Sequence, residues 1–425
     1  MKNVAILGYG TVGSGVFEVI KKNQEIVNKK AGDDINVKYV LDLRSFPGDP
    51  VEEVLVNDYE IILNDPEVEV IAEVMGGVEP AYTFVKKALL KGKSVCTSNK
   101  ELVAKHGPEL IEIAKKMKRN FFFEASVGGG IPIIRPLISS LTADDIYEIS
   151  GILNGTTNFI LTKMSKEGLD FDTVLKEAQA LGYAEKDPTA DIEGHDASRK
   201  IAILTSLVFG KTANFEEVYT EGITKITDKD FMYANKLGMS IKIFGRMQKD
   251  KDNIYAMVSP VMIDENNPLY SVNGVMNAVL VRGNVLGEAM FYGPGAGKLP
   301  TASAVVSDII DAVKHLNDNV EIQWTAEKLP LADIKLSEKK FFVRVAGEPA
   351  NDFSNIEKLF GKVVRIKLEA LTDEFAFITE KMSEADFESK IAKIKDVKNR
   401  IRIEGHWWNM LLFWATECPT NHLKY

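Results

Sequence analysis

The stretch NVAILGYGTVGSGVFEVIKKN (residues 3–23) decides the fold of the N-terminal part of the chain. A short apolar run is followed by the pattern G-x-G-x-x-G, and apolar residues then recur at helical spacing. The stretch therefore predicts a strand, a tight turn and a helix whose N–H groups could bind a pyrophosphate. We expect contacts to a dinucleotide from Gly8, Gly10, Thr11, Val12 and Gly13. The alternative is a strand–helix turn that binds no ligand.

A second apolar run, VKYVLDLRSF (37–46), predicts the strand whose end would meet the ribose of such a cofactor. Asp42 could accept hydrogen bonds from the ribose hydroxyls, which would favour NAD. Arg44 could pair with a 2′-phosphate, which would favour NADP, or it could be an ordinary solvated side chain. Because the two residues point to different cofactors, the sequence leaves the choice between NAD and NADP open.

Strand-like and helical runs alternate through the rest of the first 130 residues. This alternation predicts an α/β fold of the Rossmann type, a doubly wound parallel sheet with ligands at the carboxyl ends of its strands. Gly76, Ser98 and Lys100 fall at such ends and are further candidates for cofactor contacts. Cys96 lies inside an apolar run with no histidine near it in sequence. We therefore expect it to be a small core residue and not a thiol nucleophile.

The composition is typical of a globular protein with more than one domain. The 425 residues are 45% hydrophobic and 27% charged, and the formal net charge is −9. This acidic balance argues against nucleic acid or a membrane surface as the main partner. The most apolar late run is too short to cross a bilayer. The two distant cysteines and the lack of a signal-peptide pattern favour a cytoplasmic location.

The stretch AEKDPTADIEGHDASRK (184–200) places many charges directly before an apolar helix. Pro188 bars a helix through its own position, so we expect an ordered loop before a helix that begins near Gly194. Asp196 and Lys200, four residues apart, would share one face of that helix. An ordinary i,i+4 salt bridge beneath a capping loop is the plain alternative. Four acids that converge on one partly buried lysine instead favour a site that binds an ammonium group and moves a proton.

The pattern A-x-x-x-G-Y-A-E-x-x-P-x-x-D-I-x-G-x-D-x-x-x-K over residues 178–200 resembles the signature of homoserine dehydrogenases. The motifs GYGTVGSG, EVMGG, TSNK, EASVGGGIPII and GILNGTTNFIL also stand in that family's order, so the resemblance covers about residues 1–320. It implies reversible, NAD- or NADP-dependent conversion of L-aspartate 4-semialdehyde to L-homoserine. That reaction serves the biosynthesis of threonine, methionine and isoleucine.

The resemblance also implies roles for individual residues. Lys200 would be the general acid/base at the reacting oxygen, and Lys100 would help to bind the substrate and shift the proton. Substrate contacts are expected from Glu185, Asp191, Asp196, Tyr183, Gly155 and Thr156. Among them, Glu185 is the residue we expect to contact the amino acid itself. Gly297, in a second glycine-rich loop, would contact the cofactor.

The resemblance further implies a sodium ion at EASVGGGI. Its ligands would be Glu124 and the backbone carbonyls of Val127, Gly129 and Ile131. A glycine turn without metal is the alternative.

We expect four parts along the chain. Residues 1–130 would bind the nucleotide, with 300–320 packing back on them, and 131–320 would form an α+β substrate and dimerisation domain. The order strand, helix, strand, strand, helix, strand over 341–405 (βαββαβ) looks like an ACT domain. This order implies control by L-threonine, with a purely structural module as the alternative. Residues 406–425 have no predicted function, although they could cover an apolar patch or form an oligomer contact.

The resemblance implies a homodimer, with a tetramer also open. Two other functions remain as alternatives at this stage. Another amino-acid dehydrogenase would keep the fold, but the acidic signature before Lys200 argues against it. A catalytically silent NAD(P)-dependent sensor would not need Lys100, Lys200 and Glu185, all of which are present.

Overall fold

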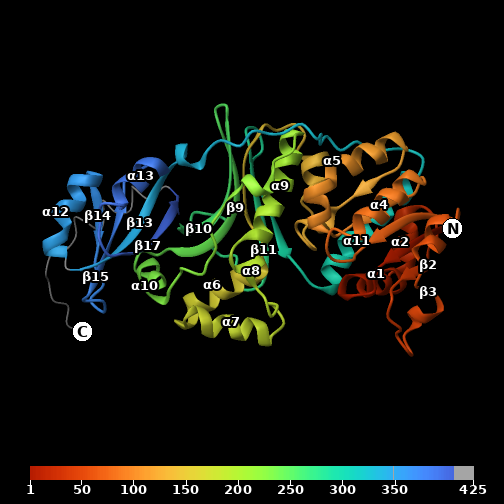
Figure 1. Cartoon of the computed structure of the whole chain (residues 1–425), viewed down its shortest axis with the longest axis horizontal. Helices are drawn as coiled ribbons and strands as arrows, with labels where there is room; N and C mark the ends of the chain where they lie inside the picture. The colour runs from red at the N-terminus through yellow and green to blue at the C-terminus, as the bar shows by residue number, and fades with distance from the viewer. Residues whose placement is uncertain (348, 406–425) are drawn as a thin grey trace, which may run out of the picture.

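The structure, a computed structural model, describes residues 1–347 and 349–405, apart from the side chains of residues 349–352. The two predictions for 406–425 lie outside these residues. Within the described part, no helix combines the length and the apolar character that a membrane span needs. The nucleotide-binding part, the middle sheet and the C-terminal module follow one another along the long axis of the molecule (Figure 1).

The N-terminal part forms a parallel sheet of six strands in the order β3-β2-β1-β4-β5-β6. Its strands are β1 (Lys2–Leu7), β2 (Ile35–Leu41), β3 (Leu55–Val56), β4 (Val68–Glu73), β5 (Ser94–Thr97) and β6 (Phe121–Phe122). Its helices are α1 (Thr11–Lys22), α2 (Gln24–Ala31), α3 (Tyr59–Asn64), α4 (Ala81–Leu90) and α5 (Lys100–Lys116). The predicted Rossmann-type fold is confirmed. Strand order reverses between β1 and β4, whose carboxyl ends border the crevice where such sheets bind ligands.

Two local features of this sheet differ from the sequence prediction, and one agrees. The strand predicted over 37–46 ends at Leu41, because Asp42 turns to accept hydrogen bonds from the backbone. The chain between β1 and β2 forms two helices, which meet at Asn23, and not one. Cys96 is completely buried in β5, as predicted for a core residue, and this burial raises the pKa of its thiol.

Helix α11 (Lys298–Lys314) returns to this sheet from far along the sequence and packs against α1, β4 and β5. Hydrogen bonds fix the chain just after it, since the Asn120 amide donates to the carbonyls of His315 and Asp318. At the other end of α11, a Cβ at Gly15 of α1 would lie 2.7 Å from the Lys298 carbonyl oxygen, so the start of α11 packs closely on the first turns of α1.

The rest of the chain forms a mixed sheet of 11 strands, whose main path runs β12-β11-β7-β9-β10-β17-β13-β15-β14. The strands of its middle part are β7 (Ile146–Ile152), β8 (Tyr219–Thr220), β9 (Ser240–Asp250), β10 (Asn253–Ile263), β11 (Met276–Gly283) and β12 (Gly287–Pro294). The helices are α6 (Gly155–Glu167), α7 (Phe171–Ala180), α8 (Thr189–Ile192), α9 (His195–Phe209) and α10 (Asp228–Lys236). Shorter helical turns occur in both parts of the fold and are η1 (Pro50–Glu53), η2 (Glu124–Ser126), η3 (Pro136–Ser140), η4 (Phe215–Glu217) and η5 (Ile334–Leu336).

The C-terminal module has the predicted order of elements, with one extra two-residue strand. It comprises β13 (Glu338–Ala346), α12 (Pro349–Phe360), β14 (Val363–Ile366), β15 (Glu374–Thr379), β16 (Met382–Ser383), α13 (Glu384–Ile391) and β17 (Val397–Glu404). The sequence did not predict its join to the rest. Strand β17 pairs in parallel with β10, with Val261 opposite Arg402, so the module continues the middle sheet.

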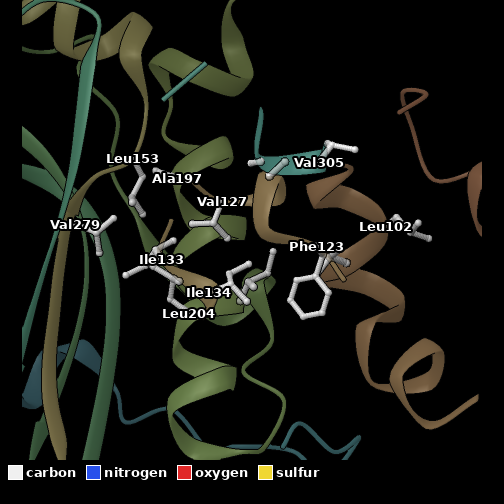
Figure 2. Close-up of a cluster of buried hydrophobic side chains, with 14 of the residues drawn as sticks. Leu102, Phe123, Val127, Ile133, Ile134, Leu153, Ala197, Leu204, Val279 and Val305 are labelled. Atoms are coloured by element: carbon white, nitrogen blue, oxygen red, sulfur yellow. The ribbon is translucent and has the colours of Figure 1, made fainter. Parts of the chain in front are cut away.

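A hydrophobic core around the segment after β6 joins the two sheets (Figure 2). Phe123, Val127, Ile133 and Ile134 of this segment are all buried. They lie among side chains of α5, α9, α11 and β11, namely Leu102, Ala197, Leu204, Val305 and Val279. Full burial of one such side chain contributes about 1.5–3 kcal/mol. The core therefore fixes the start of α9 relative to the nucleotide crevice.

Candidate functional site

The turn after β1 is shaped for close approach of a phosphate. Gly10 caps α1 without a side-chain hydrogen bond, and the first turn of the helix carries no acidic residue. A Cβ at Gly13 would lie 1.9 Å from the Gly8 carbonyl oxygen, so the helix can pack on the turn because Gly13 has no side chain. Space beside Gly10 is open, with nothing within 4 Å of an added Cβ. The free helix N–H groups and the open turn fit a pyrophosphate.

Asp42 and Arg44, which pointed to different cofactors in the sequence, bind each other. The Arg44 Nη2 lies 2.8 Å from Asp42 Oδ2, and the Tyr9 backbone N–H donates to the same oxygen at 2.8 Å. Arg44 holds the pKa of Asp42 well below its usual range, although burial opposes this shift. The Arg44 side chain is 62% exposed, so it can reach a ligand at the edge of the crevice.

Glu73, at the end of β4, organises the next two cofactor loops. Its carboxylate accepts the Met75 N–H at 2.8 Å and the Thr97 hydroxyl at 2.5 Å. The Thr97 oxygen in turn accepts the Asn99 N–H, and the Asn99 side chain caps α5, the helix that begins with Lys100. Glu73 is completely buried, and this burial raises its pKa to about 7. Glu73 was not among the predicted site residues, although its place before the GG of the EVMGG motif was a usable signal.

Of the other predicted cofactor residues, Ser98 lies half-buried in the loop after β5, and Gly76 lies exposed in the loop after β4. Gly297 caps the N-terminus of α11. Gly76, Ser98 and Gly297 therefore lie on three separate loops beside the nucleotide crevice.

Two lysines from different parts of the fold share one buried carboxylate. Asp196, in the first turn of α9, is 4% exposed. Its Oδ1 lies 2.8 Å from the Lys100 Nζ, and its Oδ2 lies 2.8 Å from the Lys200 Nζ. The predicted i,i+4 pair is therefore present, but it belongs to a three-member cluster that joins α9 to α5.

The electrostatics of this cluster are set by burial and by charge together. Burial alone would raise the pKa of Asp196, yet the positive charges of Lys200 and Lys100 hold it well below its usual range. Burial alone would lower the pKa of Lys100, but the negative charge of Asp196 raises it instead. Asp196 thus stays ionised and anchors both ammonium groups.

The end of β7 supplies two further contacts that the sequence analysis did not single out. The Lys200 Nζ donates to the Leu153 carbonyl at 2.7 Å. The Asn154 amide donates to Asp196 at 3.0 Å and to Asp191 at 2.8 Å. Burial raises the pKa of Asp191, helped by the neighbouring charge of Asp196. The position of Asn154 directly before the GTT turn was the available signal.

The remaining predicted substrate residues lie around the open side of this cluster. Gly155 and Thr156 are half-buried at the start of α6, and the Thr156 hydroxyl donates to the Tyr183 carbonyl at 2.6 Å. The Tyr183 side chain is exposed and packs edge-on against Phe159. Glu185 is exposed, and within residues 1–347 and 349–405 its carboxylate has no hydrogen-bond or ion-pair partner.

The loop over 184–193 differs from the expectation. No helix runs through Pro188, and α9 begins beside Gly194, as predicted, but α8 (Thr189–Ile192) forms a short helix between them where a loop was expected. The expected convergence of four acids on Lys200 is wrong. Asp196 contacts it and Asp191 is linked through Asn154, whereas Glu193 lines a different cleft beside the C-terminal module.

The predicted sodium residues form a buried turn after β6. The Glu124 carboxylate accepts the backbone N–H groups of Ile133, Ile134 and Arg135, at 2.6–2.8 Å. Within residues 1–347 and 349–405, no hydrogen bond ends on the backbone carbonyl of Val127, Gly129 or Ile131. That part of the chain also contains no group of three or more His, Cys, Asp or Glu side chains placed to hold a metal. A cation here would depend on carbonyl oxygens.

Comparison with known proteins supplies the family. The homoserine dehydrogenase family model matches residues 132–310, and the model for the NAD binding domain of homoserine dehydrogenase matches residues 8–124. A homoserine dehydrogenase of Bacillus subtilis is 39% identical over 96% of this chain and 99% of its own length. The chain belongs to the homoserine dehydrogenase family. It is therefore an NAD(P)-dependent oxidoreductase of the family that acts on L-homoserine and L-aspartate 4-semialdehyde.

Solved homoserine dehydrogenases have the same fold. A structure from Thiobacillus denitrificans has a TM-score of 0.86 and 37% identity, and covers 95% of this chain and 98% of its own. A hyperthermophilic archaeal homoserine dehydrogenase in complex with NADPH has a TM-score of 0.63 and 33% identity. It covers 98% of its own chain but 73% of this one. About a quarter of this chain thus has no counterpart in that match.

The buried carboxyl of Glu73 predicts a dependence of stability on pH. Its pKa is raised from 4.5 to about 7, so its contribution to folding is present at low pH and is lost as the pH rises through about 7. The loss amounts to about 3 kcal/mol at most. We expect the melting temperature of Glu73→Gln to fall less between about pH 5 and pH 8 than that of the wild type. Glu69→Gln, on the same strand, is the control, and equal slopes for all three proteins would contradict the assignment.

Proposed function

We propose that Lys200 exchanges the proton that accompanies hydride transfer between L-homoserine and L-aspartate 4-semialdehyde. The observation that carries the proposal is the position of its ammonium group. Two of the three donors of this group bind Asp196 and the Leu153 carbonyl, which leaves one for a substrate oxygen. Lys200 is 8% exposed and is fixed one turn into α9, so its direction is set by the fold.

In the reducing direction, the Lys200 ammonium would donate a proton to the aldehyde oxygen as the alcohol forms. In the oxidising direction, the neutral amine would accept the proton of the homoserine hydroxyl. The nicotinamide of NAD(P), when bound, supplies or accepts the hydride. Lys100 has two donors beyond its contact with Asp196, and we infer that it orients the same substrate oxygen or its carboxylate.

We infer that the substrate's ammonium group faces the acidic side of the cluster. Asp191 is held beside Asp196 by Asn154, and Glu185 presents an exposed carboxylate on the adjoining loop. Tyr183, Gly155 and Thr156 border the same opening. Because Glu185 has no partner among the described side chains, closure of this loop over homoserine is the simplest way for it to reach the amino acid.

The cofactor choice depends on the Asp42–Arg44 pair in this proposal. With NADP, Arg44 would bind the 2′-phosphate, while with NAD, Asp42 would accept from the ribose hydroxyls. The Arg44 guanidinium neutralises the Asp42 carboxylate, which would otherwise repel the 2′-phosphate of NADP. The ion pair therefore favours NADP. The cytoplasmic location stays a prediction from the sequence.

We propose that the turn after β6 holds a monovalent cation such as sodium through the carbonyls of Val127, Gly129 and Ile131. Glu124 would mainly stabilise the turn and not bind the cation, because its carboxylate already accepts hydrogen bonds from three backbone N–H groups. Hard cations bind carbonyl oxygens of this kind. Equal melting temperatures in sodium chloride and in choline chloride at matched ionic strength would contradict the proposal.

We propose a homodimer that forms through the edge strand β12. This strand ends the 11-strand path and pairs with β11 on one side. Met290 and Tyr292 on β12, and Val285 and Leu286 in the hairpin before it, are exposed. An exposed strand edge with apolar side chains is a ready surface for pairing with a second copy. Analytical ultracentrifugation that finds a monomer at micromolar concentration would contradict the dimer. Association of two dimers would give the tetramer.

We propose that residues 341–405 form an ACT-like regulatory module whose effector is L-threonine. The path β17-β13-β15-β14, with α12 and α13, has the order of strands and helices expected for such a module. The parallel pairing of β17 with β10 gives it a direct connection to the sheet that carries the substrate helices.

Replacement of Lys200 tests the proton-transfer role. Lys200→Met keeps an unbranched side chain but has no proton to exchange, so we expect kcat to fall by a factor of about 10²–10⁴. Lys200→Arg keeps the charge and should be equally inactive, because a guanidinium does not lose its proton. Cofactor affinity, measured by fluorescence titration, should not change. Lys186→Met, on the exposed loop, is the control, and a Lys200→Met enzyme with more than a tenth of wild-type kcat would refute the role.

Replacement of Arg44 tests the cofactor choice. Arg44→Ala removes the cation and frees the Asp42 carboxylate, so the ratio of kcat/KM with NADP to that with NAD should fall roughly tenfold or more. Lys22→Ala, at the far end of α1, should leave the ratio unchanged. If Arg44→Ala also leaves this ratio unchanged, the Asp42–Arg44 pair does not determine the cofactor preference.

A further inference from the structure

Tyr9 follows the first glycine of the phosphate turn, and its side chain is 7% exposed. The ring lies between Phe17 of α1 and Phe46 of the loop after β2. The ring centroids of Phe17 and Phe46 are 6.0 Å and 4.9 Å from that of Tyr9, and both pairs meet edge to face. Tyr9 therefore joins the phosphate turn to residues 42–49, the loop that carries Arg44 and is called the Arg44 loop below.

Hydrogen bonds from Tyr9 reach both ends of the Arg44 loop. The backbone N–H of Tyr9 donates to Asp42 Oδ2 at 2.8 Å, and its hydroxyl donates to Asp49 Oδ1 at 3.0 Å. Burial raises the pKa of the Tyr9 hydroxyl, and the bond to Asp49 raises it further. The hydroxyl therefore keeps the proton that it donates, and one residue fixes the loop at its start and at its end.

The end of the Arg44 loop is closed by its own hydrogen bonds. Asp49 Oδ1 also accepts the Val51 N–H at 2.9 Å and so caps η1. The Asp49 N–H donates to the Phe46 carbonyl at 2.9 Å, and the Phe46 N–H donates to the Glu52 carboxylate. Because Asp49 is bonded to both Tyr9 and Phe46, the Tyr9 hydroxyl helps to fix the place of the Phe46 ring.

The Phe46 ring in turn supports Arg44. The central guanidinium carbon of Arg44 lies 5.2 Å from the centroid of that ring, within the range of a cation–π contact. Its Nε and Nη2 bind the Asp42 carboxylate at 2.9 and 2.8 Å. Within residues 1–347 and 349–405, its Nη1 has no hydrogen-bond or ion-pair partner. The guanidinium is thus held on two sides and still has donors for a phosphate.

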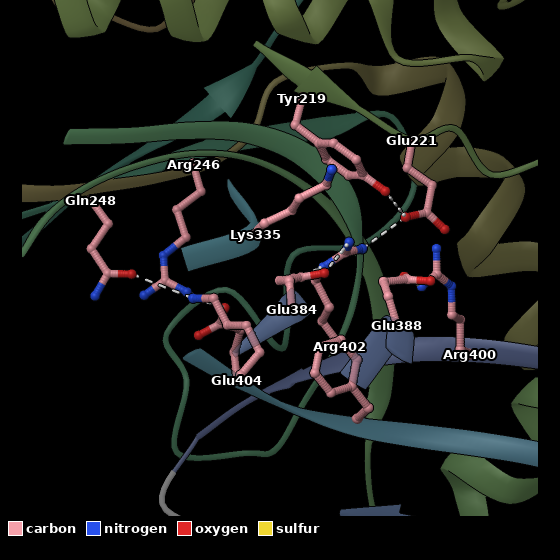
Figure 3. Close-up of polar contacts among 12 residues, drawn as sticks. Tyr219, Glu221, Arg246, Gln248, Lys335, Glu384, Glu388, Arg400, Arg402 and Glu404 are labelled. Carbon is pink, nitrogen blue, oxygen red and sulfur yellow. Dashed lines mark hydrogen bonds and ion pairs between the residues drawn. The ribbon is translucent and has the colours of Figure 1, made fainter. Parts of the chain in front are cut away.

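Arg402 shows how a structural arginine is held in this protein (Figure 3). It is 4% exposed, and all three guanidinium nitrogens bind carboxylates, at 2.6 and 2.9 Å from Glu384 and at 2.7 Å from Glu221. Arg44 differs, because its side chain is 62% exposed and pairs with a single carboxylate. An exposed arginine that binds a ligand needs another means of fixing its direction, and the contacts of Tyr9 provide one.

We propose that Tyr9 is a positioning residue that favours NADP over NAD by holding Arg44 in place for the 2′-phosphate. The proposal rests on the role proposed for Arg44 in cofactor choice. Without the Tyr9 hydroxyl, the end of the Arg44 loop loses one attachment, and Arg44 must be ordered when the phosphate binds. NAD has no 2′-phosphate, and the backbone N–H of Tyr9 still holds Asp42 for the ribose, so binding of NAD does not depend on the hydroxyl.

Calorimetric titration of the full chain tests this role without turnover. The probes are adenosine 2′,5′-bisphosphate and adenosine 5′-monophosphate, which differ only in the 2′-phosphate. Tyr9→Phe keeps the ring and removes the hydroxyl, so it should weaken binding of the bisphosphate at least threefold and leave binding of the monophosphate unchanged. Tyr82→Phe, which removes a hydroxyl bonded to Glu109 away from the Arg44 loop, should bind both probes as the wild type does.

Initial rates of homoserine oxidation should show the same selectivity. In Tyr9→Phe we expect KM for NADP to rise at least threefold, with KM for NAD and both kcat values unchanged. A loss of affinity for adenosine 5′-monophosphate equal to that for the bisphosphate would show that the variant disturbs the phosphate turn as a whole. That result would overturn the proposal.

A double-mutant cycle with Arg44→Ala separates this inference from the function on which it rests. If Tyr9 acts through Arg44, Tyr9→Phe should weaken binding of the bisphosphate no further in the Arg44→Ala protein. An equal loss in both backgrounds would overturn the proposal, and so would a Tyr9→Phe protein that binds the bisphosphate as the wild type does. If Arg44→Ala itself leaves binding of the bisphosphate unchanged, the proposed role of Arg44 in cofactor choice fails as well.

Discussion

The ion-pair cluster of Asp196 with Lys100 and Lys200 is the interaction on which the rest of the site depends. A buried carboxylate without partners would be strongly destabilising, and two unshielded ammonium groups would repel each other. The cluster therefore forms when α5, α9 and the end of β7 meet in one arrangement. Lys100 begins α5 in the nucleotide-binding part, and Lys200 lies on α9 beside the second sheet, so the same contact also places the substrate helices against the cofactor crevice.

The hydrophobic core after β6 packs against the helices that carry the cluster (Figure 2). The segment 123–134 packs between α5 and α9, and the amides of its later residues are held by Glu124. A rigid core of this kind limits movement to the surrounding loops. The exposed loop with Glu185 is left free to respond to ligands.

Local patterns in the sequence predicted the local structure well. The glycines of the first turn, the helix that begins beside Gly194 and the order of elements in 341–405 all follow from spacing and turn chemistry. What the sequence could not predict depends on contacts between distant segments. Asn154 and the Leu153 carbonyl reach Asp196 and Lys200 through the fold. The GTT turn after Asn154 indicates a polar turn at this position, but it does not indicate these distant partners. The pairing of β10 with β17 is non-local for the same reason.

The pH dependence of kcat/KM for homoserine oxidation in Asp196→Asn tests the central claim most directly. An amide cannot balance two ammonium charges, so the pKa of Lys100, which Asp196 raises, should fall. We predict that the falling limb of the profile, where Lys100 loses the proton with which it binds the substrate, moves to lower pH and that the maximal rate falls, with cofactor affinity unchanged. A profile that superimposes on that of the wild type would show that the shared carboxylate does not control the lysines.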